Sequence, residues 1–190
     1  MHKRPPQHVS HEYHKIIERA YDCCRKNINP NWVIEPDDVH EGLFRGLLFG
    51  TKNSPIPGSA FKFTLFLDAY KLAEQPEISF ECNLSFHPYF FKSTIGTDNT
   101  NFCFPNPCTC RDDLNVILDN LWKYFFLDKI KKNSIFSTFP LRFELKESMI
   151  NQSGANDFIK SNGYGQFWDK LRALGNIQIP AVEENEQNPA

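Results

Sequence analysis

Three of the six cysteines of this 190-residue chain lie close together, in a segment where thiol or metal chemistry could occur. Cys103, Cys108 and Cys110 fall within eight residues of a stretch that also holds proline and asparagine. A structural zinc site takes four ligands in two spaced pairs, and no fourth cysteine or histidine lies nearby in sequence. The sequence therefore predicts no metal and no cofactor, which leaves a thiol nucleophile as the chemistry to consider.

Cys103 is the candidate for that nucleophile, and it stands between Phe102 and Phe104. Apolar neighbours raise the pKa of a thiol and so disfavour the reactive thiolate. A partly buried loop thiol is therefore favoured over a catalytic one. Cys108 and Cys110 are weaker candidates. The three cysteines outside this cluster fall in segments that indicate helix or strand, where cysteine acts as a small hydrophobic residue, namely Cys23, Cys24 and Cys82.

His87 and Pro88 open the segment that leads to these cysteines. An acid–base role requires a partner carboxylate or nucleophile within reach, and the sequence positions none beside the imidazole. We expect His87 to be hydrogen-bonded by backbone groups and the His-Pro pair to turn the chain. The other five histidines are scattered and do not form a set of metal ligands.

The elements that must position these residues can be predicted from hydrophobic periodicity. Ser10 is a suitable N-cap for an amphipathic helix that ends at Asn29 and Pro30. Four short strands follow, over residues 32–35, 43–49, 60–68 and 77–82. A helix followed by four closely spaced strands indicates an α+β domain, in which the helix lies on a four-stranded antiparallel meander.

The second half of the chain is predicted to hold a long loop and a central buried helix. Residues 86–111 show no periodicity, and Asp112 is a suitable cap for the helix that follows. The apolar stripe of this helix comprises Leu114, Ile117, Leu118, Leu121, Trp122, Phe125 and Phe126. Two short C-terminal helices are expected around Phe158 and from Phe167 to Leu174. We expect one domain over residues 11–178, between a flexible basic tail (1–10) and a disordered acidic tail (179–190).

Composition excludes some classes of protein. The chain has 21 basic and 23 acidic residues and a net charge of −2, whereas a general nucleic-acid binder needs a basic excess. No apolar run is long enough to span a membrane, and the first ten residues do not read as a secretory signal. These features predict a cytosolic or nuclear protein.

The order of these motifs resembles the core of the ubiquitin-conjugating (E2, UBC-like) enzymes, over residues 12–127. The resembling segments are residues 58–63 (Gly-Ser-Ala-Phe-Lys-Phe), Tyr70, residues 76–80 (Pro-Glu-Ile-Ser-Phe) and His87-Pro88. The resemblance implies a UBC-like fold and, if the chain is active, a thioester on Cys103. Two positions depart from the family: Tyr89 stands where the family has the asparagine of His-Pro-Asn, and Asn99 stands where ungapped counting from a loop glycine would place the cysteine.

These departures favour the non-catalytic branch, and the chain most resembles the Fused Toes (Akt-interacting) proteins. That resemblance implies an adaptor that binds a Hook-type coiled-coil protein and its Hook-interacting subunit, peripheral to vesicles or the cytoskeleton. Two alternatives stay open. One is a divergent active ubiquitin-conjugating enzyme that uses Cys103, and the other is a variant that binds ubiquitin or an active E2.

Overall fold

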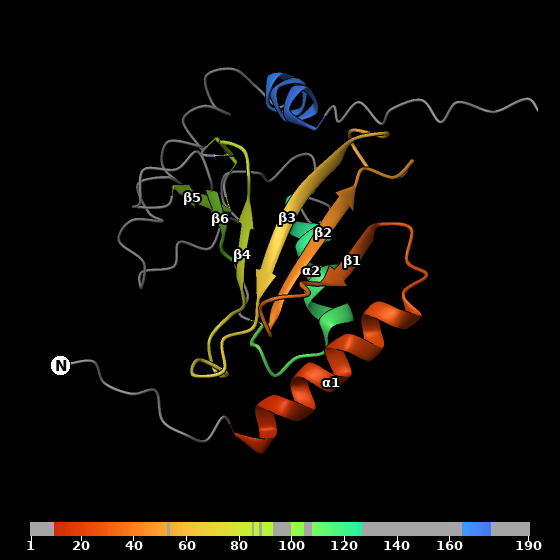
Figure 1. Ribbon diagram of the computed structural model, residues 1–190. Coiled ribbons are helices and arrows are strands. Elements are labelled where there is room, and N and C mark those ends of the chain that lie inside the picture. The colour runs from red at the N-terminus through yellow and green to blue at the C-terminus, as the bar shows by residue number, and fades with distance from the viewer. Residues whose placement is uncertain are drawn as a thin grey trace, which may run out of the picture.

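The computed structural model describes residues 10–52, 54–84, 86–87, 89–92, 100–104, 108–126 and 165–175. In this part of the chain two longer helices, α1 and α2, accompany one antiparallel sheet of six strands, and a shorter helix follows over residues 165–174 (Figure 1). The α+β class predicted from the sequence is therefore confirmed. The predicted tails lie almost entirely outside the described residues, as do Phe158 and its expected helix.

Helix α1 (His11–Lys26) begins where the sequence predicts. The backbone N–H of Tyr13 donates to Ser10 Oγ at 3.2 Å, which satisfies one of the amides that a helix start leaves unpaired. The helix ends before the predicted Asn29, because the Asn27 side chain bonds to the chain that follows. Its Nδ2 donates to the Trp32 carbonyl at 3.2 Å, and its Oδ1 accepts from the Asn29 amide at 2.9 Å.

Strands β1 (Trp32–Pro36), β2 (Leu43–Phe49), β3 (Ala60–Phe66) and β4 (Glu77–Phe80) form a meander in chain order. All four were predicted, with ends differing by no more than two residues. The alternation predicted for β3 is present: Phe61, Phe63 and Leu65 are buried, whereas Lys62 is exposed. β1 forms one edge of the sheet, next to α1, which also packs against α2 (Figure 1).

The prediction of four strands was wrong in number, because two more lie within the segment expected to be loop. These are β5 (Phe90–Lys92) and β6 (Thr100–Phe102), and the sheet order is β1-β2-β3-β4-β6-β5. Each is only three residues long, too short to show alternation in sequence. Thr100 ties β6 to the end of β4: its Oγ1 donates to the Cys82 carbonyl at 2.8 Å and accepts from the Leu84 amide at 3.3 Å.

Helix α2 (Leu114–Phe125) carries the predicted stripe, and every member of that stripe is buried. Its N-cap is Asp113 rather than the predicted Asp112. The Asp112 carboxylate instead accepts from the Thr109 amide at 2.7 Å in the preceding turn. Trp122 fixes the helix to the sheet, since its indole N–H donates to the Phe49 carbonyl at 2.8 Å.

The helix over residues 165–174 falls in the predicted C-terminal region and packs on the domain through Phe167 and Leu171, which are fully buried. Its end is bound to the sheet, because the Ala60 amide donates to the Gly175 carbonyl at 3.0 Å. None of the helices in the described part of the chain has the length and hydropathy to cross a membrane.

Candidate functional site

His87 lies between β4 and β5, and its ring meets the last turn of α2. The imidazole Nε2 is 2.8 Å from the carbonyl oxygen of Phe125, and Nδ1 is 3.2 Å from the backbone nitrogen of Tyr89. An amide nitrogen can only donate, so Nδ1 must be the acceptor and the ring proton must be on Nε2. Both nitrogens are therefore bonded to backbone, which leaves the ring in one tautomer.

The surroundings of His87 keep it neutral. Its side chain is fully buried, with Phe90 edge-on at 4.9 Å and Phe125 stacked at 5.4 Å between ring centroids. Burial lowers the pKa of His87 from 6.5 to about 4, although the hydrogen bond to the Phe125 carbonyl opposes the shift. A neutral imidazole with both nitrogens bonded to backbone has no free lone pair or proton to exchange with a substrate.

Tyr89 and Cys103, the two other candidates, meet through the backbone. The Cys103 amide donates to the Tyr89 carbonyl at 2.8 Å, so the residue after β6 is held beside the start of β5. The Tyr89 ring is buried and packs edge-on against Tyr124, with 5.4 Å between the ring centroids. The sequence-predicted positions 87, 89 and 103 are thus brought to one region, at the C-terminal end of α2.

The Cys103 side chain is only 8% exposed. Its neighbours Phe102 and Phe104 are 1% and 0% exposed, with their rings edge to face at 4.8 Å. This is the apolar environment that disfavours a thiolate. The sequence predicted a partly buried thiol because both neighbours of Cys103 are apolar, and its low exposure agrees with that prediction.

Gln75, which sequence reasoning did not single out, fixes the backbone on both sides of Cys103. Its Nε2 donates to the Phe102 carbonyl at 3.3 Å, and its Oε1 accepts from the Phe104 amide at 3.2 Å. An amide side chain is suited to this task because it carries both a donor and an acceptor. Its position just before Pro76 was the available signal, but a glutamine in a turn does not indicate a partner 27 residues away in sequence.

Burial is the largest cause of a raised pKa at four of the other cysteines, namely Cys23, Cys24, Cys82 and Cys110. The pKa rises to about 11 at Cys24 and Cys82, which disfavours their thiolates. Among the described residues, no three His, Cys, Asp or Glu side chains come together as a group that could hold a metal ion. Pro88 and Asn99 lie outside the described residues.

The geometry of this region suits packing better than catalysis. Its imidazole, tyrosine ring and thiol are buried, and backbone hydrogen bonds fix the chain at each of them. No protein-family model matches the sequence, and no curated protein matches it.

Proposed function

We propose that this chain is a non-catalytic UBC-like module that works as a scaffold or adaptor through protein–protein contacts. The order of its elements supports the UBC-like part of the proposal. A helix, four antiparallel strands in chain order and a second buried helix follow one another as the resemblance to ubiquitin-conjugating enzymes implies. The additional strands β5 and β6 occupy the segment between His87 and Cys103.

The observation that carries the non-catalytic part is the burial of His87 and Cys103. Conjugation through a thioester needs an accessible thiolate and a donor that stabilises the oxyanion when an amine attacks. The Cys103 side chain is 8% exposed, and His87 is neutral with both ring nitrogens bonded to backbone. A buried tyrosine ring, Tyr89, stands where the family has an amide. Loss of one such donor typically lowers the rate by about 10²–10³-fold.

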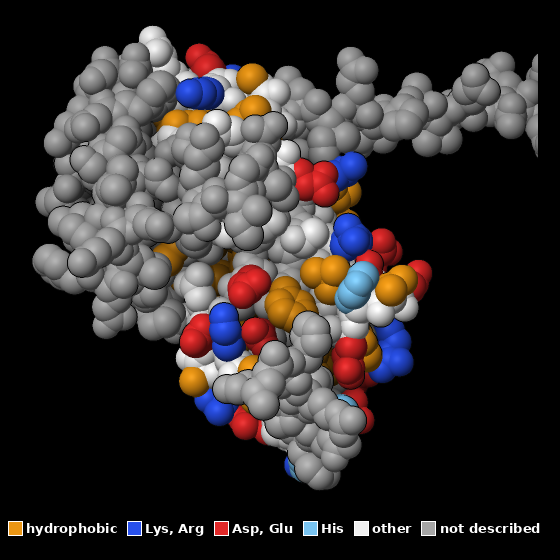
Figure 2. All heavy atoms as spheres, turned by 60° about the vertical axis from the view of Figure 1, so that its left-hand side comes forward, with side chains coloured by type: hydrophobic (Ala, Val, Ile, Leu, Met, Phe, Trp, Pro, Cys, Tyr) orange, Lys and Arg blue, Asp and Glu red, His pale blue; other side chains and the backbone are white. Residues whose placement is uncertain are grey.

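The adaptor role is drawn from the resemblance to the Fused Toes proteins. On this view the partners are a Hook-type coiled-coil protein and its interacting subunit, and the protein acts in vesicle transport in the cytoplasm. The described surface seen in Figure 2 intersperses acidic, basic and hydrophobic side chains. A mixed surface of this kind suits protein partners better than a phosphate backbone, which favours one extended basic patch.

A thioester assay tests the proposal directly. The full chain and its Cys103→Ala variant are incubated with ubiquitin, the ubiquitin-activating enzyme and ATP, and run on gels with and without dithiothreitol. We expect no dithiothreitol-sensitive band from either protein, because Cys103 is buried between two buried phenylalanines. A known active E2 in a parallel reaction must give the band.

A dithiothreitol-sensitive band from the natural chain that Cys103→Ala abolishes would overturn the proposal and establish the divergent active enzyme. The adaptor role has a separate readout: the tagged chain should co-purify with a long coiled-coil protein. A ubiquitin-binding variant would instead shift ubiquitin resonances on titration and form no adduct.

A further inference from the structure

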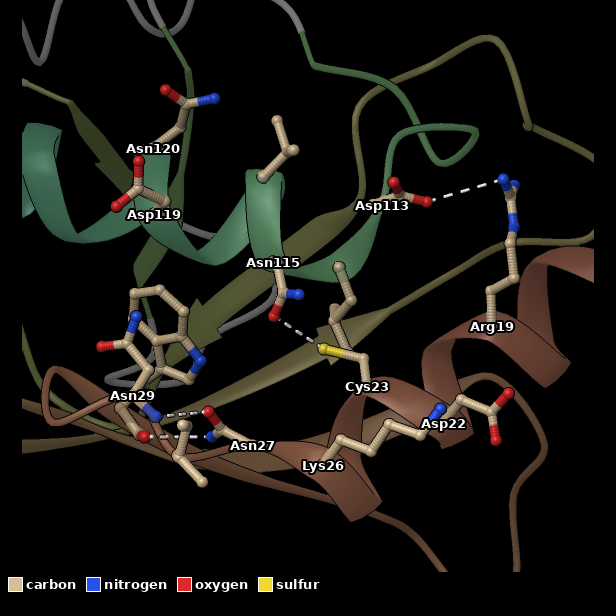
Figure 3. A pocket seen from close by; sticks show the side chains of 14 residues that line it. Arg19, Asp22, Cys23, Lys26, Asn27, Asn29, Asp113, Asn115, Asp119 and Asn120 are labelled. Atoms are coloured by element: carbon tan, nitrogen blue, oxygen red, sulfur yellow. Dashed lines mark hydrogen bonds and ion pairs between the residues drawn. The ribbon is translucent and has the colours of Figure 1, made fainter.

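A hollow of about 880 Å³ lies between the C-terminal half of α1 and the first half of α2 (Figure 3). Its lining includes none of His87, Tyr89 and Cys103. Two interactions join the helices across it. The Cys23 thiol donates to Asn115 Oδ1 at 2.9 Å, and the Arg19 guanidinium lies 3.5 Å from the Asp113 carboxylate. This size is within the usual range for sites that bind small molecules or peptide side chains.

Trp32 lines this groove and carries a polar atom without a partner. The side chain is 1% exposed, and its indole Nε1–H is buried with no hydrogen-bond acceptor among the described residues. A buried donor left unpaired typically costs about 1–3 kcal/mol. An acceptor brought into the groove by a ligand would remove that cost, so the groove favours an occupant that presents a carbonyl or carboxylate oxygen.

The charges around the groove also favour an acceptor. Each of its three carboxylates is already paired with a cation: Asp22 with Arg25, Asp113 with Arg19, and Asp119 with Lys123. Lys26 also lines the groove, and its ammonium forms no ion pair with the described residues. The groups available to a ligand are therefore mainly donors.

Two exposed aliphatic side chains complete the groove. Ile28 is 97% exposed and Val116 is 48% exposed, and both are among its lining residues. They come from the two sides, Ile28 from the turn after α1 and Val116 from the first turns of α2. An aliphatic side chain placed between them would bury apolar area on both.

From these features we propose that the groove between α1 and α2 binds a short acidic peptide segment of a partner protein. A peptide carbonyl accepts from the Trp32 indole, a Glu or Asp side chain pairs with Lys26, and an aliphatic residue packs on Ile28 and Val116. This inference rests on the proposed function, because it assigns the partner surface of a module that works through protein contacts.

The test is a selection of random 12-residue peptides on the immobilised full chain, followed by NMR titration. The double variant Lys26→Gln/Ile28→Ser serves for counter-selection. We expect the enriched peptides to combine acidic and aliphatic residues. On titration they should move the indole N–H resonance of Trp32 downfield and leave that of Trp122 in place, because Trp122 already donates to the Phe49 carbonyl.

Matched variants separate the groove from the rest of the surface. Lys26→Gln and Ile28→Ser should each weaken the Kd of a selected peptide at least about 5-fold, a difference of about 1 kcal/mol. Lys15→Gln on the same helix and Val39→Ser, another exposed aliphatic residue, should leave it unchanged.

Failure to enrich any peptide, enrichment of peptides without acidic residues, or a Trp32 resonance that does not move would overturn this inference. None of these results would affect the proposed function, which the thioester assay decides separately.

Discussion

At the scale of single residues, His87 joins three parts of the chain that lie far apart in sequence. Its ring bonds to the last turn of α2 through the Phe125 carbonyl, orients the Tyr89 amide, and packs against Phe167 of the helix over residues 165–174. The contact with the Tyr89 amide requires the neutral imidazole, because a second ring proton would face the Tyr89 N–H. The folded state therefore binds a proton at this site less readily than the unfolded chain does.

His87 should make the protein less stable as pH falls from 6.5 to about 4. The folded pKa of about 4 is below the unfolded value of 6.5, so the unfolded state takes up more protons in that window. A shift of this size corresponds to about 3 kcal/mol of stability, fully present above pH 6.5 and lost progressively below it. Urea denaturation at half-unit pH steps measures the change.

The control variant is His14→Gln, which makes the same substitution at an exposed histidine of α1. His87→Gln should flatten the profile between pH 6.5 and 4. If that variant does not fold, NMR of the natural chain decides: a His87 ring that titrates near pH 6.5 in the folded state would contradict the prediction. The Asp37 carboxylate acts in a lower window, because bonds from His40 and Arg45 hold its pKa well below the usual range.

Sequence reasoning identified His87 as a residue bonded by backbone groups, but it could not identify the groups. The Phe125 carbonyl is 38 residues away in sequence. The bond forms only because the last turn of α2 packs beside the His87 ring. Gln75 was missed for the same reason. Local spacing indicates caps and turns, whereas a side chain that bonds a distant backbone segment becomes evident only when the elements are packed.

At the scale of elements, the turn between β1 and β2 sets how closely Tyr13 of α1 approaches the sheet. Gly42 precedes β2 with a φ of +82°, a conformation that side-chain-bearing residues rarely adopt. A Cβ there would come within 2.5 Å of the Tyr13 hydroxyl and 2.8 Å of the Leu67 carbonyl. The Gly42 carbonyl accepts from the Leu67 amide at 2.9 Å. This hydrogen bond holds the turn close to Leu67, so the backbone cannot easily move to make room for a side chain.

Gly42→Ala should destabilise the fold by about 3 kcal/mol, as backbone strain adds to overpacking. Gly58→Ala is the matched control, because Gly58 has a φ of +80° but a Cβ there would meet nothing within 4 Å. That variant should lose only about 1 kcal/mol, the cost of the left-handed backbone. Chemical denaturation of both variants measures the difference, and equal losses would show that contact with Tyr13 and Leu67 does not matter.

The elements were predictable to different degrees. Strand β3 alternates over seven residues and α2 repeats its apolar positions over three turns, so periodicity was sufficient for both. β5 and β6 have three residues each, and their strand character comes from pairing with one another and with β4. The candidate site lies in this part of the sheet, which explains why the sequence indicated its residues but not its geometry.

At the scale of the whole molecule, the helix over residues 165–174 belongs to the same core as the sheet. Phe167 is fully buried, with its ring edge to face with Phe86 at 5.6 Å and against His87 at the same centroid distance. The fold class could be predicted from the first half of the chain alone. The packing of the helix over residues 165–174 could not be predicted, because its short sequence does not show which surface of the domain it covers.

Phe167→Ala should lower the free energy of unfolding by about 3–5 kcal/mol, the usual cost of removing a buried aromatic ring. Leu174→Ala, on the same helix but 39% exposed, should cost less than about 1 kcal/mol. Thermal and urea unfolding of the two variants distinguish a helix that is part of the core from one that rests loosely on it. Small losses of unfolding free energy in both variants would show that the helix is not part of the core.

The edge of the sheet at β1 has a consequence for how copies of this protein behave at high concentration. A further strand that approached β1 could not bond to the Trp32 carbonyl without competing with the Asn27 side chain, which already donates to it. At Pro36 it would meet no backbone N–H donor. The β1 edge is therefore a poor template for edge-to-edge strand pairing between copies of the protein.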